Sequence, residues 1–225
     1  MDKHLMSGNE AIAQGAWEAG CAVGVGYPGT PSTETLEALV RKEGVYCEWA
    51  PNEKVALEVG LGAAIGGVRS LVTMKHVGVN VAADPLMSAC NTGVNAGLVL
   101  LAADDPSCYS SQNEQDSRFY AAFARIPCLS AADSAEAYGM CRDAFELSER
   151  FTRTLVSPSG ERADAEPRAY EDNIGKYVMM PANAVRRRAA VDERTAELER
   201  YAETCGWNRV ERRGEKVGVI CSGAV

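Results

Sequence analysis

Four short apolar segments, separated by longer stretches with helical spacing, constrain the fold of this chain most. The segments cover residues 22–26, 45–49, 70–74 and 97–103. Their apolar character is nearly continuous rather than alternating, which is typical of strands buried on both faces. Strands that alternate with helices form parallel sheets. The sequence therefore predicts an α/β fold in which a parallel sheet has helices on both faces.

The intervening stretches predict the helices. Apolar residues recur at helical spacing in residues 7–20. Thr30-Pro31 is typical of an N-cap followed by proline at the first helical position, in a helix that ends near Gly44. Further helices are expected from Glu53 along a stripe of small residues, through Leu86 and Cys90, over residues 134–151, and over the charged residues 182–204. Residues 75–80 are expected to form a polar loop, and residues 126–129 a short strand or extended piece.

The composition changes after residue 151, where residues 157–167 are polar and are expected to form a loop or linker. We expect one large domain in residues 1–155, and a linker with a charged helical segment in residues 156–213. Residues 214–225 read as the first strand of a truncated second domain. A lone strand cannot form a domain, which favours a chain that ends inside a longer polypeptide.

The charge balance and the cysteines exclude several classes of protein. With 31 acidic against 23 basic residues the net charge is -8, which argues against nucleic acid or an anionic membrane as the main partner. The eight cysteines are scattered singly, so neither a disulfide framework nor a zinc site is expected. The sequence has no signal-peptide pattern and no uninterrupted apolar run of about 18 residues. We expect a cytoplasmic protein.

Glu53 is the first candidate for chemistry, because it stands where the second predicted strand gives way to a helix. In open parallel sheets, ligands bind in the crevice beyond the carboxyl ends of the strands. A simpler interpretation is that Glu53 is only part of a helix start. With Pro51 at the first helical position, Glu53 would be the third residue and could close a capping box.

Polar loops follow all four predicted strands, at residues 27–33, 51–53, 75–80 and 104–113. In a parallel sheet these ends meet at one edge, which predicts a single crevice. The candidates beside Glu53 each have a structural alternative. Thr30 could be only a helix cap, His76 next to Lys75 could be a satisfied loop or core histidine, and Gln112 and Asn113 could begin a helix.

A glycine pattern offers a second interpretation. Residues Gly24, Gly26 and Gly29 match G-x-G-x-x-G after a strand, and Glu48 stands where a ribose-binding acid is expected. Pro28 removes a backbone donor from this loop, however, and the predicted helix begins only after the third glycine. The match is therefore weak support for a nucleotide-binding domain.

Four motifs together resemble a known family. They are residues 26–34 (GYPGTPSTE), 48–54 (EWAPNEK), 74–85 (MKHVGVNVAADP) and 110–116 (SSQNEQD). They resemble the alpha subunits of indolepyruvate:ferredoxin oxidoreductases, within the thiamine-diphosphate-dependent 2-oxoacid:ferredoxin oxidoreductase family. The resemblance is strong over about residues 5–150, and residues 168–225 resemble the next part of these subunits, notably at 177–183 (YVMMPAN).

The resemblance implies that residues 1–155 form the pyrimidine-binding domain for thiamine diphosphate. Glu53 would hydrogen-bond the pyrimidine ring nitrogen and promote the tautomer that activates the thiazolium carbon. The family position also assigns Tyr27, Pro28 and Thr30 to the cofactor, and it assigns a set of residues to the substrate: Thr30, Lys75, His76, Gln112 and Asn113. The implied reaction is oxidative decarboxylation of arylpyruvates such as indolepyruvate to aryl-acetyl-CoA and carbon dioxide, with ferredoxin as electron acceptor.

The chain also departs from the family pattern. It lacks the G-D-G…N pattern that binds diphosphate and Mg²⁺, and the clustered cysteines of 4Fe-4S centres. The resemblance therefore implies that further carboxyl-terminal domains, a second (beta) subunit and an oligomeric assembly complete the enzyme, and that the chain alone is inactive. Residues 152–166 match poorly, at the far edge of the predicted sheet. The alternative function is a catalytically inert binding or assembly module that retains the fold.

Overall fold

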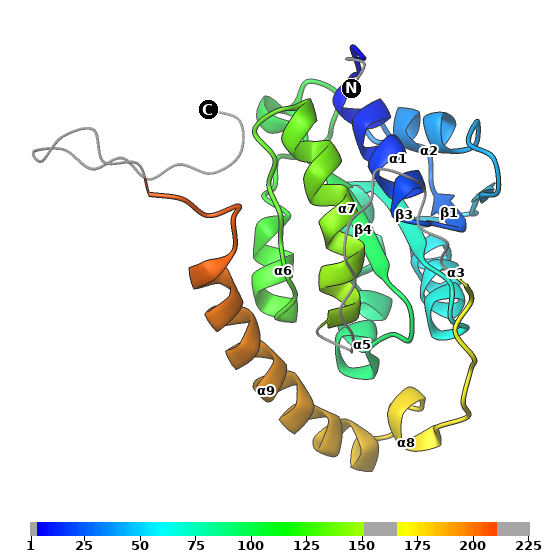
Figure 1. Cartoon of the computed structure of the whole chain (residues 1–225), viewed down its shortest axis with the longest axis vertical. Coiled ribbons are helices and arrows are strands. Elements are labelled where there is room, and N and C mark those ends of the chain that lie inside the picture. Colours follow the sequence, from blue (N-terminus) through cyan, green and yellow to red (C-terminus); the bar gives the residue numbers. More distant parts are fainter. Residues whose placement is uncertain (1–3, 151–165, 211–225) are drawn as a thin grey trace, which may run out of the picture.

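The computed structural model describes residues 4–150 and 166–210 (Figure 1). Within these ranges four parallel strands form one sheet in the order β2-β1-β3-β4. The strands are β1 (Val23–Gly26), β2 (Tyr46–Trp49), β3 (Ser70–Lys75) and β4 (Leu98–Ala103). The four predicted strands and the α/β fold class are confirmed.

Helices connect the strands and cover both faces of the sheet. They are α1 (Gly8–Glu18), α2 (Thr33–Leu39), α3 (Glu53–Ile65), α4 (His76–Val81), α5 (Ala83–Thr92), the 3-10 turn η1 (Pro106–Cys108), α6 (Arg118–Ala124) and α7 (Ser134–Arg150). Helix α1 starts at a capping box between Ser7 and Glu10, each of which bonds the backbone N–H of the other. This reciprocal pair satisfies two of the amide donors that a helix start leaves open.

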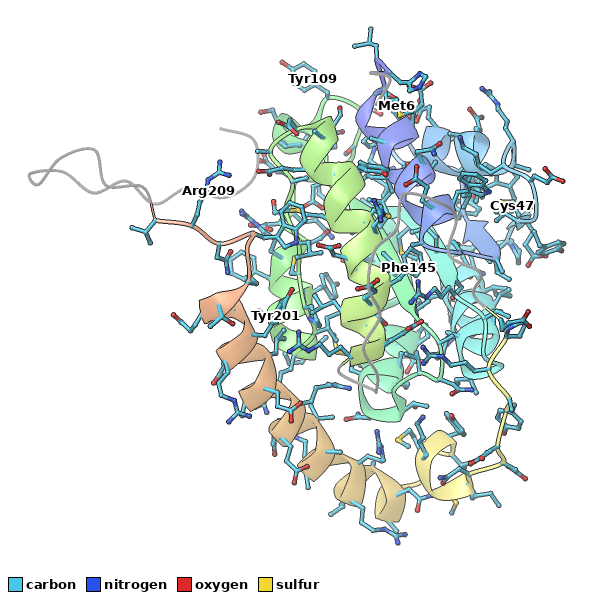
Figure 2. The ribbon with its side chains drawn as sticks, in the orientation of Figure 1. Met6, Cys47, Tyr109, Phe145, Tyr201 and Arg209 are labelled. Atoms are coloured by element: carbon cyan, nitrogen blue, oxygen red, sulfur yellow. The ribbon has the colours of Figure 1, made fainter. Side chains whose placement is uncertain are left out.

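Two apolar clusters hold the layers together, one on each face of the sheet. On one face, Val72 and Met74 of β3 pack with α3, α5 and α6. On the other, Leu71 packs with α1, α2 and α7, where Phe145 is fully buried (Figure 2). Every residue of β3 is buried, as expected for a central strand of a parallel sheet.

The segment after the α/β layers runs along the outside of the domain (Figure 1). It contains α8 (Ile174–Tyr177) and α9 (Pro181–Thr204). Arginines of α9 reach the last turn of α5: Arg187 Nε donates to Asn91 O at 3.0 Å, and an Arg194 terminal nitrogen donates to Cys90 O at 2.8 Å. The charged helix predicted near residues 182–204 is present, and part of its charge serves to attach it.

Two local predictions were wrong. Residues 75–80 are not a loop, because α4 begins directly at His76 and buries Val79 in the core. Helix α2 begins at Thr33 rather than Pro31, because a hydrogen-bonded turn comes first. Of the two alternatives for residues 126–129, the structure has the extended piece and not the strand, so β4 is an edge strand of the described sheet.

Parts of the predicted organisation lie outside the described residues. These are the strand expected in residues 214–225 and most of the polar stretch 157–167, together with the poorly matching segment up to residue 165. None of the helices in residues 4–150 and 166–210 combines the length and hydropathy that a transmembrane span requires.

Candidate active site at the carboxyl edge of the sheet

The topology singles out one place on the carboxyl edge of the sheet. From β1 the chain crosses through α2 to β2 on one side, and then through α3 to β3 on the other side of β1. The connections therefore diverge between β1 and β3, where Gly26 is aligned with Thr73. Ligands of open α/β sheets bind in the crevice at such a switch point.

Glu53 is the first residue of α3 and lies next to this edge. The helix is capped by Asn52, whose side-chain oxygen accepts from Val55 N at 2.9 Å. The prediction that Pro51 opens the helix is therefore wrong, and Glu53 is not the third residue that a capping box needs.

The partly buried Glu53 side chain packs against Gly78 of α4. A Cβ placed on Gly78 would lie 2.5 Å from Glu53 Cγ and 2.6 Å from Glu53 Oε1. Among the described residues, no hydrogen bond or ion pair engages the Glu53 carboxylate. The carboxylate is therefore held in place by packing, while its oxygens stay available to a ligand.

The loop after β1 carries Tyr27, Pro28 and Thr30, which are all exposed. Its base is fixed by hydroxyl groups: Ser32 Oγ donates to Gly29 O at 2.8 Å, and Thr33 Oγ1 accepts from Gly29 N at 2.9 Å. Thr30 does not cap α2, so the capping interpretation of this residue was wrong. The three candidate residues thus lie in an exposed loop at the carboxyl end of β1, which we call the rim loop.

The glycine pattern in this region has a packing role. A Cβ on Gly24 would lie 2.8 Å from Leu39 Cδ2, and one on Gly26 would lie 2.5 Å from Thr73 Oγ1. The strand order also differs from the 3-2-1-4 order of the dinucleotide-binding fold. These two observations do not support the nucleotide-binding interpretation of the glycine pattern.

Lys75 and His76 are buried and bind main-chain carbonyls of the segment between β4 and α6. Lys75 Nζ donates to Ser110 O at 2.5 Å, and His76 Nε2 lies 3.1 Å from Asn113 O. Because its partner is a carbonyl oxygen, His76 Nε2 carries the proton. His76 Nδ1 is then a buried acceptor without a partner among the described residues.

Asp105 organises the same segment from within. Its Oδ2 accepts from Ser110 N at 2.8 Å and from the Ser111 hydroxyl, and lies 3.8 Å from Lys75 Nζ. The Ser111 hydroxyl, the Ser110 amide and the Lys75 charge together lower the pKa of Asp105 below its usual value. The side chain is thus held as a carboxylate next to the buried lysine.

The side chains of Gln112 and Asn113 are exposed, and Asn113 contributes its carbonyl oxygen rather than its amide to His76. These residues do not begin a helix, since α6 starts at Arg118. We did not predict the amides that join the segment to α4. Gln115 Nε2 donates to His76 O at 2.6 Å, and Asn80 Nδ2 donates to Gln115 Oε1 at 2.9 Å.

The signal that could have identified these residues was present in the sequence. Asn80 and Gln115 lie in the two motifs at 74–85 and 110–116, and complementary amides in neighbouring strand-end segments are able to pair. Gly78 and Asp105 lie at strand ends too. Their partners, however, come from other elements, so only the folded chain reveals them.

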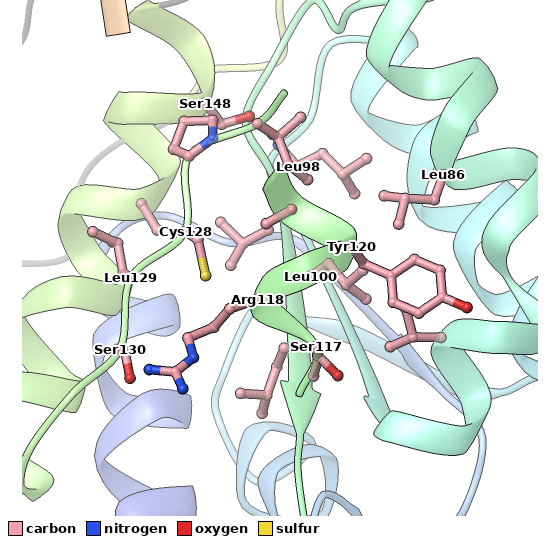
Figure 3. Close-up of a pocket in the computed structure, with 18 of the residues that line it drawn as sticks. Leu86, Leu98, Leu100, Ser117, Arg118, Tyr120, Cys128, Leu129, Ser130 and Ser148 are labelled. Carbon is pink, nitrogen blue, oxygen red and sulfur yellow. Dashed lines mark hydrogen bonds between the residues drawn. The ribbon is translucent and has the colours of Figure 1, made fainter. Parts of the chain in front are cut away.

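A large apolar cavity lies beside β4, the edge strand of the described part of the sheet (Figure 3). It measures about 1020 Å³ and is bounded by β4, by helices α5, α6 and α7, and by the extended residues 126–131. Leu98, Leu100 and Tyr120 line it (Figure 3). None of the eight candidate site residues borders this cavity, although Gln115 of the neighbouring segment does.

No group of three His, Cys, Asp or Glu side chains in residues 4–150 and 166–210 is placed to hold a metal ion. The polar groups at the carboxyl edge of the sheet are the Glu53 carboxylate, the exposed loop with Thr30, and the segment held by Lys75 and His76. This arrangement suits an organic ligand that binds to a single carboxylate, that of Glu53.

Comparison with known proteins identifies the family of this fold. The family model of pyruvate flavodoxin/ferredoxin oxidoreductases, thiamine-diphosphate-binding, matches residues 14–160. Indolepyruvate oxidoreductase subunit IorA of Thermococcus kodakarensis is 42% identical over 99% of this chain, and that of Methanothermobacter marburgensis is 44% identical over 99%. The chain spans only 38% and 39% of the lengths of these two relatives.

A solved structure supports the fold. The 2-oxoglutarate:ferredoxin oxidoreductase from Magnetococcus marinus, determined with 2-oxoglutarate, coenzyme A and succinyl-CoA bound, superposes with a TM-score of 0.66 at 18% identity. The superposition covers 87% of this chain and 45% of that one. With the family model matching well over half of its residues, the chain belongs to the thiamine-diphosphate-binding family of pyruvate flavodoxin/ferredoxin oxidoreductases.

Proposed function

We propose that this chain forms the pyrimidine-binding half of a thiamine diphosphate site in an enzyme that oxidatively decarboxylates arylpyruvates. The substrate class follows from the relatives that are named indolepyruvate oxidoreductases. In this proposal coenzyme A takes the acyl group and ferredoxin takes the electrons. A second subunit and other domains hold Mg²⁺, the diphosphate and the iron-sulfur clusters.

The observation that carries the proposal is the Glu53 carboxylate, which lies at the carboxyl edge of the sheet against Gly78 of α4, without a partner among the described residues. A pyrimidine ring nitrogen is a single basic atom, and one carboxyl group at a helix start fits it. In our proposal Glu53 hydrogen-bonds this nitrogen and exchanges a proton with it through one carboxylate oxygen. When bound, thiamine diphosphate supplies a nucleophilic carbon that adds to the 2-oxo carbon and holds the electron pair released with carbon dioxide.

The other candidates have two different roles in this proposal. Tyr27, Pro28 and Thr30 contact the cofactor edge from the exposed rim, and Thr30 also faces the substrate carboxylate. Lys75 and His76 position the segment over residues 104–117, because both are buried and bind its carbonyls. Gln112 and Asn113 present their exposed side chains to the substrate from that segment.

The test is Glu53→Gln in the assembled enzyme, with Glu58→Gln as the matched control. The control makes the same chemical change on an exposed face of α3. Among the described residues, Glu58 pairs only with Lys54, at 3.2 Å. We expect Glu53→Gln to lower the rate of arylpyruvate-dependent ferredoxin reduction by about 10²- to 10⁴-fold, the usual contribution of one acid–base group. The control should retain the wild-type rate.

Equal rates for Glu53→Gln and the wild type would contradict the proposed role of Glu53. A wild-type assembly without arylpyruvate-dependent activity would instead favour the inert binding module.

A further inference from the structure

Gly78 lies in the middle of α4 with an ordinary helical backbone, so its conformation does not require glycine. Within a helix, alanine is more favourable than glycine, because glycine loses more conformational freedom on folding. The reason for a glycine at this buried position must therefore lie in what surrounds it.

The atoms around Gly78 belong to Glu53. A Cβ at position 78 would lie 2.5 Å from Glu53 Cγ, 2.6 Å from Glu53 Oε1 and 2.9 Å from Glu53 Cδ. All three distances are far below van der Waals contact. The Glu53 side chain thus packs directly against α4 at Gly78.

Helix α4 cannot easily withdraw from this contact. Its first residue is tied by His76 Nε2 to Asn113 O, and its far end by Asn80, which donates to Gln115 at 2.9 Å and accepts from Tyr120 OH at 2.6 Å. Between these ties Val79 is only 1% exposed in the core. A side chain added at position 78 would therefore displace the flexible Glu53 side chain rather than the helix.

We propose that Gly78 is a positioning residue for the thiamine diphosphate site: the missing side chain at position 78 sets where the Glu53 carboxylate stands. This inference rests on the proposed function of Glu53 and extends it to a residue that acts only through the position of Glu53. Displacement of a catalytic group by about 1 Å can lower a rate by about 10²-fold.

The first measurement needs no cofactor. In the full chain labelled with ¹³C at glutamate carboxyl groups, the Glu53 resonance is assigned by its loss in Glu53→Gln. We expect Gly78→Ala to shift this resonance and Gly62→Ala to leave it in place. Gly62 is the matched control, because it lies on the same helix as Glu53, is exposed, and has nothing within 4 Å of an added Cβ. An unshifted resonance in Gly78→Ala would overturn the inference.

The second measurement uses the assembled enzyme. Gly78→Ala should lower kcat/KM for arylpyruvate, or raise the KM for thiamine diphosphate, by at least about tenfold, whereas Gly62→Ala should stay within about twofold of the wild type. In the Glu53→Gln background, Gly78→Ala should have no further effect, because the group that it displaces has already lost its function.

The outcomes separate the two proposals. Wild-type kinetics of Gly78→Ala together with a large loss in Glu53→Gln would overturn the role of Gly78 and leave that of Glu53 intact. Wild-type kinetics of Glu53→Gln would overturn both. If Gly78→Ala fails to fold, Glu53→Ala/Gly78→Ala should fold, because the obstructing atoms are gone, and an unfolded double variant would overturn the inference.

Discussion

At the scale of single residues, Asp105 decides how the segment between β4 and α6 is held. Its carboxylate accepts from the Ser110 amide and the Ser111 hydroxyl and lies near Lys75. The pKa of Asp105 is lowered in the folded chain, so the ionised form is the stabilising one. The stabilisation is therefore present at neutral pH and is lost as the pH falls through the depressed pKa.

We expect Asp105→Asn to loosen this segment at neutral pH, because the amide loses the charge that faces Lys75 and offers fewer lone pairs to the two serines. Amide hydrogen exchange of residues 108–115 should become faster. In the wild type the same acceleration should appear only under acid conditions. The control is Asp84→Asn, which alters an exposed ion pair with Lys54. Unchanged exchange in Asp105→Asn would show that the segment is held without this carboxylate.

The sequence alone predicted some residues of the candidate site but not their contacts, and the reason is physical. Glu53 was found because a strand end followed by a helix start is a local pattern. Its contact with Gly78 depends on how α3 packs against α4, which no local pattern encodes. Likewise Lys75 was expected to face the crevice, yet its amine is bound to a carbonyl 35 positions along the chain.

At the scale of elements, the attachment of α9 to α5 depends on arginines at the open carbonyls of a helix end. The last four carbonyls of a helix have no partner within it, and basic side chains can satisfy them. Arg194 donates to Cys90 O at 2.8 Å, and Arg187 donates to Asn91 O at 3.0 Å. Both side chains carry the charge that the α5 dipole favours at this end.

Arg194→Met should keep much of the aliphatic packing and remove the hydrogen bond to Cys90 O. We expect a loss of about 1–2 kcal/mol in the free energy of unfolding, the usual range for a hydrogen bond from a charged donor. Urea unfolding monitored by circular dichroism measures it. Arg200→Met, at an exposed position of the same helix, is the control. Equal unfolding midpoints for the two variants would mean that the hydrogen bond of Arg194 adds nothing to the attachment of α9.

Elements with long, regular patterns were predictable from the sequence, and short ones were not. The strands follow from their continuous apolar runs, helix α1 from apolar periodicity, helix α3 from its stripe of small residues, and α9 from its run of charged residues. Helix α4 was missed, since it has six residues, no side-chain cap and a glycine at its centre. Its stability comes from tertiary packing, where Val79 enters the core and amides from other segments bind its ends.

At the scale of the whole molecule, the carboxyl edge and the amino edge of the sheet carry different kinds of residues. The carboxyl edge carries the exposed rim and the Glu53 carboxylate. The amino edge carries a buried ion cluster, in which Arg69 binds Glu149 through two hydrogen bonds of 2.7 and 2.9 Å. Arg168 reaches the same carboxylate at 2.6 Å, and Gly97 N donates to it at 2.9 Å. The cluster thus joins β3, α7 and the chain near β4.

Glu149→Gln should destabilise the whole fold by about 3–5 kcal/mol, because the buried Arg69 guanidinium loses its counter-charge. Burial raises the pKa of Glu149, but the bonds and charge of Arg69, the Gly97 amide and the charge of Arg168 together outweigh it, so the net shift is downward. The wild-type stabilisation is then lost as the pH falls through the lowered pKa.

Urea unfolding at pH 7 measures this loss, with Glu146→Gln on the same helix as the control. If Glu149→Gln were as stable as the control, the cluster would add nothing to the stability of the fold.

The ion pair between Glu149 and Arg168 also brings together two points that are 19 positions apart in the chain. Arg168 N further donates to Gly67 O at 2.8 Å, so this residue is fixed at the amino edge of the sheet. The segment that carries α8 and α9 is thus attached to the α/β layers near its start, at Arg168, and again along α9, at Arg187 and Arg194. It should therefore unfold together with these layers rather than as a separate cooperative unit.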